Sequence, residues 1–359
     1  MTASPTAAQL PGVAPAPAPA GAPPDILEPG PPDATQPPPE RRRKVAILLL
    51  LLLGLTILLA IVIWYLLFRQ PIPLPGIPET QIPTYRSAIY GVDRPMGIAV
   101  SPSGDRIYVS ETEGERIVRI FAADGAALGT LRPPVETGSN HVPVYVAIDP
   151  ITSEVYVSDR PTGSVYVYDR DGAYLREYRP AAAGDGWQPL AMAFDAEGTL
   201  YVSNLAGPFQ RVLVIDRAGN LVRTLGAGQQ LAFPNGVAVD PSGNVYVTDS
   251  NNGRLLVYGP DGAVVGQIGR GVGEGNLGLP RGLAIDERGR VFTVDTSGQG
   301  LFVYRVLAEG QQRPEFLGFF GGHGLENGLF RYPNDVAVDG RGRVFVTDSA
   351  NDRVQVWSY

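Results

Sequence analysis

Cysteine is absent from the 359 residues, histidine occurs only at His141 and His323, and Lys44 is the only lysine. Without cysteine the chain has no disulfide, no thiolate metal site and no cysteine nucleophile. Two histidines cannot supply a three-histidine metal site. The formal net charge is -7, so the chain lacks the basic surface with which proteins bind nucleic acid backbones. We therefore expect no nucleic acid partner.

Proline and small residues dominate the N-terminal part of the chain. Residues 1–40 contain 13 prolines and few large apolar side chains. Such a segment buries too little apolar surface to offset the entropy of ordering it. Residues 1–44 are therefore predicted to be a disordered, Pro/Ala-rich cytoplasmic tail that ends in four basic residues.

Residues 45–68 form a run of 24 residues without a charged side chain. A helix of this length is about 36 Å long, enough to cross a hydrocarbon core of about 30 Å. The basic residues 41–44 precede it and only Arg69 follows it closely, which favours a cytoplasmic N-terminus. A cleaved signal peptide would need a shorter apolar region and a small-residue cleavage site, and residues 66–70 offer none. The sequence predicts a single-pass anchor in the plasma membrane, with residues 69–80 as a Pro-rich linker.

The remainder of the chain, residues 81–359, repeats one pattern six times. Each copy begins with a proline, and a short apolar strand with an alanine at its fifth position follows, as in Pro234-Asn235-Gly236-Val237-Ala238-Val239. The prolines are Pro95, Pro143, Pro189, Pro234, Pro280 and Pro333, at intervals of 48, 46, 45, 46 and 53 residues. A repeat of this length is typical of propeller blades.

Each repeat reads as four antiparallel strands. In the fourth, the turns at residues 241–243 and 260–262 place strands over residues 236–240, 244–249, 254–258 and 263–268. The chain ends after the third strand of the sixth repeat, whereas residues 81–91 form an unassigned strand before the first. Pairing the two removes an exposed sheet edge, so we predict that residues 81–91 complete blade six and close the ring.

The segment Pro234 to Arg254 resembles the NHL repeat family, and the likeness extends over residues 81–359. This resemblance implies an all-β, six-bladed β-propeller with four-stranded blades. It says little about function, because one fold serves many.

The residue after each proline is expected to line the mouth of the central channel. These residues are Met96, Val144, Leu190, Asn235, Arg281 and Asn334, and Tyr145 and Asp335 come one step later. Among similar propellers, the peptidyl-amide-forming lyases bind zinc through histidines at several of these positions, and none here is histidine. Lactonases of the gluconolactonase type hold a divalent metal with Glu, Asn and Asp. Asn235, Asn334 and Asp335 resemble two of these ligand types and would suit calcium, but no glutamate is present there and Arg281 repels a cation. We expect no cofactor, with calcium as the alternative.

Two recurrent sets of polar residues are interpreted as structural. The first consists of turn-capping carboxylates: Asp149, Asp195, Asp240, Asp286 and Asp339. The second closes the second strand of each repeat: Glu111, Asp159, Asn204, Asp249, Asp295 and Asp348. Arginines that follow these, namely Arg116, Arg211, Arg254 and Arg353, are expected to pair with them, with a charged rim for a ligand as the alternative.

Loop length predicts which face of the propeller is functional. The connections before the first strand and after the second strand share one face, and residues 132–142, 205–210 and 321–332 make them long. Turns on the other face, such as residues 241–243 and 287–289, are short and are expected to offer no spare side chains.

Function is expected on the long loops. We therefore predict that a protein or small-molecule ligand binds around Tyr145, Asn235, Arg281, Asn334 and Asp335. The leading interpretation is a membrane-tethered, extracytoplasmic, bacterial binding module that acts as a sensor or scaffold. The alternative is a metal-dependent, lactonase-like hydrolase or lyase acting on a small molecule at the channel mouth.

Overall fold

The computed structural model describes residues 39–68, 82–134, 140–184, 186–207, 209–271 and 273–359. It divides into two compact units, Met1–Leu67 and Phe68–Tyr359, which we treat separately. The expected disordered tail, up to residue 38, and the expected linker, residues 69–80, lie outside the described residues.

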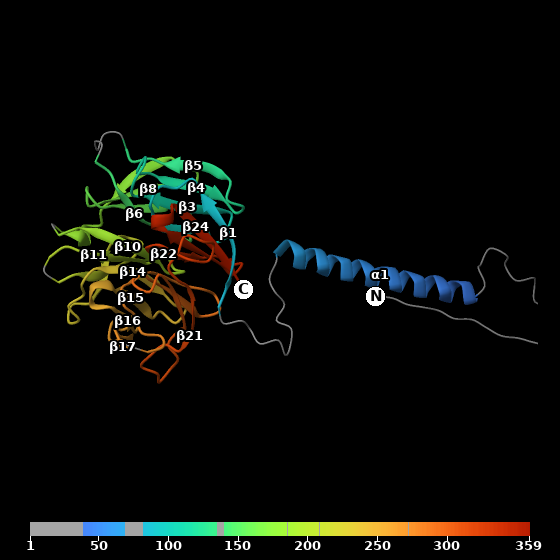
Figure 1. The fold of residues 1–359 in the computed structure, drawn as a ribbon. Coiled ribbons are helices and arrows are strands. Elements are labelled where there is room, and N and C mark those ends of the chain that lie inside the picture. Colours follow the sequence, from blue (N-terminus) through green and yellow to red (C-terminus); the bar gives the residue numbers. More distant parts are fainter. Residues whose placement is uncertain (1–38, 69–81, 135–139, 185, 208, 272) are drawn as a thin grey trace, which may run out of the picture. The chain divides into compact units, whose positions relative to one another are not determined.

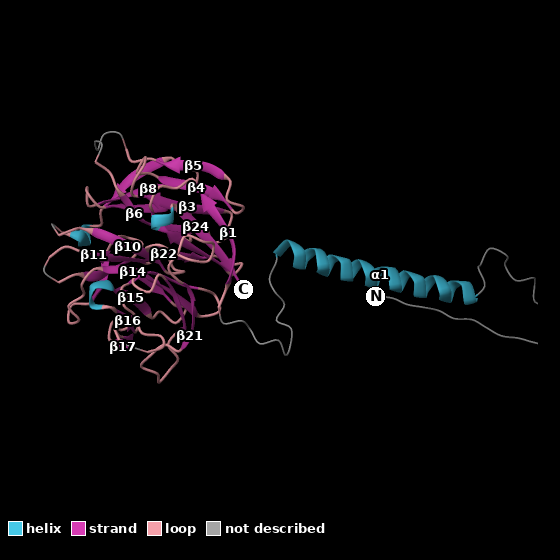
Figure 2. Ribbon diagram, in the orientation of Figure 1, coloured by secondary structure: helices cyan, strands magenta, loops and turns pink. Residues whose placement is uncertain are grey.

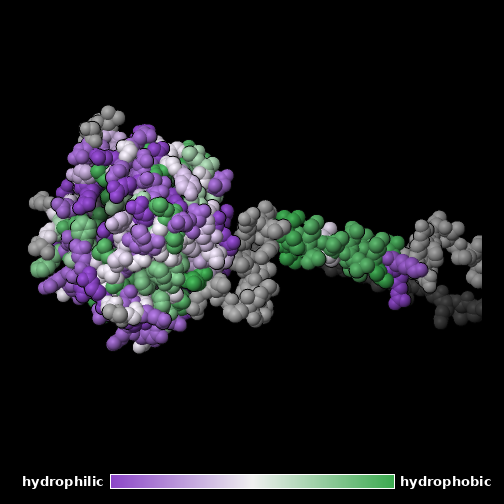
Figure 3. All heavy atoms as spheres, viewed as in Figure 1, coloured by the Kyte–Doolittle hydropathy of each residue, from purple (hydrophilic) through white to green (hydrophobic). Residues whose placement is uncertain are grey.

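The first unit contains one long helix, α1 (Pro39–Phe68). Within it, Arg43–Ile63 is long and apolar enough to cross a membrane. The described side chains of this segment are exposed and mostly hydrophobic, with the basic residues at the N-terminal end (Figure 3). α1 begins before the uncharged run at residues 45–68, so the basic residues 41–44 are helical.

The second unit is a six-bladed β-propeller, as the sequence predicts. Its described strands form six four-stranded antiparallel sheets, which follow one another in chain order around the ring (Figure 1). Blades one to three consist of β2 (Pro95–Val100), β3 (Arg106–Glu111), β4 (Val118–Ala122) and β5 (Ala127–Leu131); β6 (Pro143–Ile148), β7 (Val155–Asp159), β8 (Ser164–Tyr168) and β9 (Tyr174–Tyr178); and β10 (Pro189–Phe194), β11 (Leu200–Asn204), β12 (Arg211–Ile215) and β13 (Leu221–Leu225).

The strands of blade four start and end within two residues of those predicted for the fourth repeat. Blades four to six consist of β14 (Pro234–Val239), β15 (Val245–Asp249), β16 (Arg254–Tyr258) and β17 (Val264–Ile268); β18 (Pro280–Ile285), β19 (Arg290–Asp295), β20 (Gly300–Arg305) and β21 (Phe316–Gly321); and β22 (Pro333–Val338), β23 (Arg343–Asp348), β24 (Arg353–Ser358) and β1 (Thr84–Tyr90). Short 3-10 turns, Ala181–Ala183, Ser250–Asn252 and Ser349–Asn351, are the helical pieces described in this unit (Figure 2).

The prediction that residues 81–91 close the ring is confirmed. β1 is the outer strand of blade six and pairs antiparallel with β24, from Thr84 opposite Ser358 to Tyr90 opposite Arg353. In Figure 1 the blue-cyan β1 accordingly lies beside the red β24. The N-terminal and C-terminal strands of the propeller therefore hold each other in place.

The core lies between neighbouring blades. Ala99 packs in one apolar cluster with Val146 and Val155 of blade two, and Ala337 packs with Ile98 and other side chains of blade one. A methyl group fits where the innermost strands crowd together, which explains why alanine recurs in every repeat.

We call the end of the propeller at which the first strand of each blade begins the loop-rich face. The opposite end, which carries the turns between first and second strands, is the short-turn face. The chain reaches the propeller at the short-turn face, because β1 starts opposite Ser358, at the end of β24, and runs towards Arg353, at its start.

Candidate functional site

Four of the six mouth residues are held in place by hydroxyl groups on the neighbouring blade. Each of these hydroxyls belongs to a second strand and donates a hydrogen bond to a main-chain oxygen of the next first strand. The bonds run from Ser110 to Val144 (2.8 Å), Ser158 to Leu190 (2.7 Å), Thr248 to Arg281 (2.5 Å) and Thr347 to Met96 (3.0 Å). The mouth is therefore a ring fixed by these bonds at four positions. It is apolar on blades one to three (Met96, Val144, Leu190) and polar on blades four to six (Asn235, Arg281, Asn334).

Tyr145 and Asn334 meet at the channel mouth, although blade one separates their blades. Tyr145 comes from β6 in blade two, and its buried phenol oxygen accepts a hydrogen bond from Asn334 Nδ2 of blade six at 3.4 Å. The same Nδ2 donates to the main-chain oxygen of Met96 at 3.0 Å. Burial raises the pKa of Tyr145 above its usual range, the charge of Asp335 adds to this rise, and the charge of Arg281 opposes it. Arg281 and Asp335 are thus close enough to act on the phenol.

Asp335 is a buried carboxyl group held by main-chain donors. Its Oδ2 accepts the N–H of Ile98 in blade one at 2.9 Å. Burial raises its pKa to about 7, although the N–H groups of Ile98 and Val336 favour the charged form. Its other oxygen lies against Gly282, where a Cβ atom would overlap it, so blade five needs glycine at this position.

Arg281 differs from the arginines that begin the third strands of blades four and six, because it has no counter-ion in the described residues. Its Nε is buried without a hydrogen-bond partner. By contrast, Arg254 pairs with Asp249 at 2.7 Å and Arg353 with Asp348 at 2.8 Å. The guanidinium of Arg281 is therefore an unneutralised positive charge at the mouth.

Asn235, the fifth residue predicted for the site, is placed on the same ring but faces its own blade. Its Nδ2 donates to Ser250 Oγ at 2.7 Å and to the main-chain oxygen of Phe233 at 3.4 Å. It makes no described contact with Tyr145 or Asn334. The structure thus brings Tyr145 into contact with Asn334 and places Arg281 and Asp335 close to the Tyr145 phenol. Asn235 instead bonds within its own blade.

A hollow of about 390 Å³ opens on the loop-rich face over blades two to four. Its walls are Arg160, Pro161, Thr162, Gly163, Trp187, Gln188, Pro189, Leu190, Leu205, Gln210 and Phe233. Leu190 belongs both to this wall and to the mouth, and it shares an apolar cluster with Tyr145 and Met96. The hollow therefore adjoins the apolar half of the mouth.

Sequence reasoning missed Phe233 and Arg160. Phe233 precedes a ring proline and has a φ of 60°, a left-handed conformation that is strained for a bulky residue. Its N–H donates to Gln210 Oε1 of the enlarged loop in blade three, and the Arg160 guanidinium lies 5.8 Å from the centre of its ring. The sequence signal was the aromatic residue before Pro234, which the repeat pattern alone does not distinguish from core.

The carboxylates that close the second strands have the structural role expected of them. Each accepts a main-chain N–H from the loop that precedes the first strand, as Asp249 does from Ala232 (2.7 Å) and Asp348 from Arg331 (2.7 Å). Of the four predicted pairings, those of Arg254 and Arg353 are confirmed. In blade one, Arg119 rather than Arg116 pairs with Glu111, and in blade three the Asn204 side chain bonds to main-chain groups of Gln188, Gly186 and Ala206 rather than to Arg211. Arg119 lies on β4 beside the carboxylate, whereas Arg116 has a left-handed φ of 55° in the loop before that strand.

The turn carboxylates also cap main-chain groups as predicted. Asp240 Oδ1 accepts the N–H groups of Ser242 and Asn244, both at 2.9 Å. Asp339 Oδ1 accepts those of Arg341 and Arg343 in the same way, at 3.0 and 2.8 Å.

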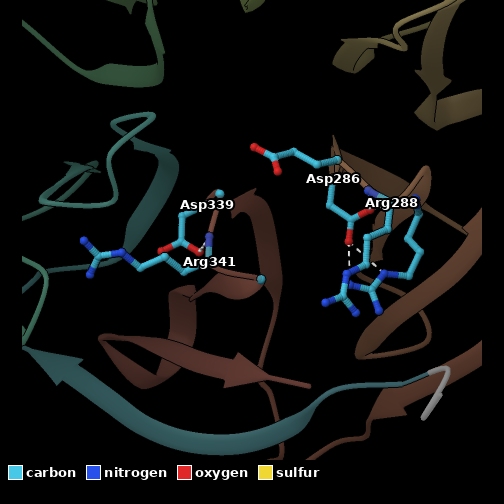
Figure 4. Close-up of a pocket in the computed structure, with 8 residues that line it drawn as sticks. Asp286, Arg288, Asp339 and Arg341 are labelled. Atoms are coloured by element: carbon cyan, nitrogen blue, oxygen red, sulfur yellow. Dashed lines mark hydrogen bonds and ion pairs between the residues drawn. The ribbon is translucent and has the colours of Figure 1, made fainter. Parts of the chain in front are cut away.

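The expectation that the short turns offer no spare side chains was wrong in blades five and six. A hollow of about 130 Å³ lies between their turns, and Glu287, Arg288 and Arg341 are among its walls. Figure 4 shows Asp286 and Arg288 on one side of this hollow and Asp339 and Arg341 on the other. Arg290 pairs with Asp286 and Arg343 with Asp339, each at 2.7 Å. Because charges of both signs alternate here, the hollow has no single preference for an anion or a cation.

The two histidines lie apart from this mouth cluster. His141 is buried, with Nδ1 3.2 Å from Asp159 Oδ2 and its ring 5.6 Å from that of Tyr166. His323 forms an isolated bridge with Phe330. Across the described ranges, no three His, Asp or Glu residues are grouped so that they could hold a metal ion.

Comparison with known proteins supports the fold. The NHL repeat model matches residues 231–258 and 330–357. No curated protein is similar enough in sequence to match the chain. Among solved structures, one titled "Streptogramin B lyase structure" has a TM-score of 0.54 and 10% identity, covering 78% of this chain and 99% of its own. A virginiamycin B lyase from Staphylococcus aureus has a TM-score of 0.52 and 12% identity, covering 76% and 98%. At this identity the likeness extends to the fold alone.

Proposed function

We propose that this chain, a six-bladed β-propeller with NHL repeats, is a membrane-tethered binding module whose loop-rich face takes up a ligand outside the cytoplasm. The observation that carries the proposal is the hollow beside the channel mouth. Its wall is largely apolar, and through Leu190 it adjoins the ring of mouth residues that carries Arg281, Tyr145 and Asn334. Ligand sites are typically concave and mostly apolar with a few fixed polar groups.

The tether supports this arrangement. Arg43–Ile63 meets the length and composition of a membrane span, and the basic residues 41–44 favour a cytoplasmic N-terminus. Because β1, the first strand of the propeller, starts at the short-turn face, the chain enters the propeller at that face and not at the loop-rich face.

Protease treatment of intact spheroplasts tests the topology. An added protease is expected to digest the propeller and spare a tag placed before residue 44, and the reverse result contradicts the orientation. Permeabilised spheroplasts, in which the protease digests the propeller and also cleaves the tag, are the control.

A small-molecule screen tests the binding function itself. The full-length chain in detergent is expected to show a raised unfolding temperature with at least one compound, because a ligand of the folded state stabilises it by mass action. That compound should also perturb the fluorescence of Trp187 in the hollow. The proposal is contradicted if the compounds that stabilise the chain leave the fluorescence of Trp187 unchanged and stabilise Phe233→Ala equally, because they then bind elsewhere.

An enzyme at the same mouth is the second candidate function. The titles of the two similar solved structures name lyases, and Asp335 and Asn334 offer oxygen donors of the kind that calcium binds. Mass spectrometry of a bound compound after incubation distinguishes the two functions. Recovery of the unchanged compound supports a binding module, whereas conversion that EDTA stops and calcium restores supports the enzyme.

A further inference from the structure

The guanidinium of Arg281 is the starting point, since it belongs to a half-buried side chain for which the described residues supply no counter-ion. Its main chain is fixed by the hydrogen bond from Thr248, and its Nε is sealed from solvent without an acceptor. A buried polar group without a partner is rare in proteins, and an arginine in this state offers planar, charge-assisted hydrogen bonds to a carboxylate. The position is therefore set up for an anion.

No carboxylate of the described residues fulfils this role. Asp335 is the acidic residue of the mouth, and its oxygens are engaged with the N–H of Ile98 and packed on Gly282. It makes no ion pair with Arg281, in contrast to Asp249, which holds Arg254 at 2.7 Å. With its pKa raised to about 7, Asp335 also contributes less negative charge than an ordinary aspartate. The mouth consequently remains electropositive beside Arg281.

The apolar wall of the hollow reaches the same ring of mouth residues as Arg281, through Leu190. Trp187, Leu190, Leu205 and Phe233 line the hollow, and the main-chain oxygen of Phe233 contacts the Nδ2 of Asn235, which stands between Leu190 and Arg281 on the ring. A volume of about 390 Å³ falls within the range of about 300–1,000 Å³ for small-molecule sites. The surface therefore suits a ligand with an apolar body and one anionic end.

We propose that the mouth and hollow bind an organic acid: its carboxylate pairs with Arg281 and its aromatic or aliphatic body occupies the hollow beside Leu190 and Phe233. This inference rests on the proposed binding function and adds the ligand's chemical class. A phosphate is a poorer match, because phosphate sites gather several main-chain N–H groups at a helix N-terminus or a nest, and the mouth is built from strands and one arginine.

The test compares 3-phenylpropionate with its neutral amide, which has the same body and no charge. Both are titrated into the full-length chain in detergent at pH 7.5, by calorimetry and by Trp187 fluorescence, with Trp187→Phe to identify the optical signal. The acid is expected to bind at least about tenfold more tightly than the amide, since a charge-assisted hydrogen bond pair is being added.

Variants test whether Arg281 is the source of the preference for the acid over the amide. Arg281→Gln should bring acid and amide within about twofold of each other, while Arg281→Lys keeps part of the difference because it keeps the charge. Arg341→Gln, at an exposed arginine on the short-turn face, is the matched control and should retain the full preference. Phe233→Ala should weaken acid and amide alike, because both share the apolar body.

The outcomes separate this inference from the proposed function. If the wild-type chain binds acid and amide equally in the hollow, the acid-specific site is wrong and the binding module stands. The acid-specific site is equally wrong if Arg281→Gln melts like the parent and keeps the preference. If neither probe binds, the organic-acid assignment is wrong, and the compound screen decides the binding function separately.

Discussion

Replacing Asp335 with asparagine should make the protein more stable at neutral and alkaline pH. In the folded chain, burial raises the pKa of Asp335 from 3.8 to about 7, so the folded chain keeps this proton up to about pH 7 while the unfolded chain loses it above about pH 4. The unfolded state then binds fewer protons, and the wild-type free energy of unfolding falls as pH rises from about 4 to about 7 and is level above that. A difference of about 3 pH units corresponds to about 4 kcal/mol. Asparagine has nearly the same shape and can still accept the N–H of Ile98.

The assay is urea denaturation of the full-length wild type and Asp335→Asn in detergent, followed by the fluorescence of Trp187 and Trp357 at several pH values between 4 and 8.5. Groups that both chains share cancel in the difference between their free energies of unfolding. That difference should shift in favour of the asparagine variant by about 4 kcal/mol between pH 4 and pH 8. A difference that does not change with pH, or that favours wild type as pH rises, refutes the reasoning about Asp335.

Three further changes test how the propeller is held together. Deleting residues 81–91 removes β1 and exposes the edge of β24, so the midpoint of thermal unfolding should fall by more than about 10 °C; an unchanged midpoint would show that ring closure is dispensable. Gly282→Ala should cost about 1–3 kcal/mol because its Cβ overlaps Asp335, whereas Gly228→Ala, which meets nothing within 4 Å, should be near neutral; equal effects contradict the packing. Asp348→Ala leaves Arg353, only 4% exposed, without its counter-ion and should cost about 3–5 kcal/mol in chemical denaturation, against little for the exposed turn residue Asp261→Ala; a cost below about 1 kcal/mol would count against this buried pair.

The repeat pattern was sufficient to predict the fold, including its closure. Six prolines with a common spacing fixed the number of blades, and a sixth blade with one strand too few required the strand at residues 81–91. These are consequences of main-chain pairing and sheet edges, which periodicity reports directly.

The repeat pattern could not predict side-chain contacts between different blades or loops. The hydrogen bond between Tyr145 and Asn334 joins blades two and six, which blade one separates, and it depends on side-chain length rather than on spacing. The left-handed conformation of Phe233 likewise depends on the acceptor that Gln210 provides from another loop. The same holds for Arg119, which takes the place predicted for Arg116 because of its position on β4.

The most direct test of the central claim is the affinity of a ligand found by the screen, measured for variants on the two faces. Arg281→Ala and Phe233→Ala alter the mouth and hollow of the loop-rich face, and Ser242→Ala and Arg288→Ala alter the short-turn face. Binding at the loop-rich face predicts that each variant of the first pair weakens affinity at least about tenfold, or about 1.4 kcal/mol, and that the second pair leaves it unchanged. If only the second pair weakens binding, the ligand sits on the short-turn face and the claim is contradicted.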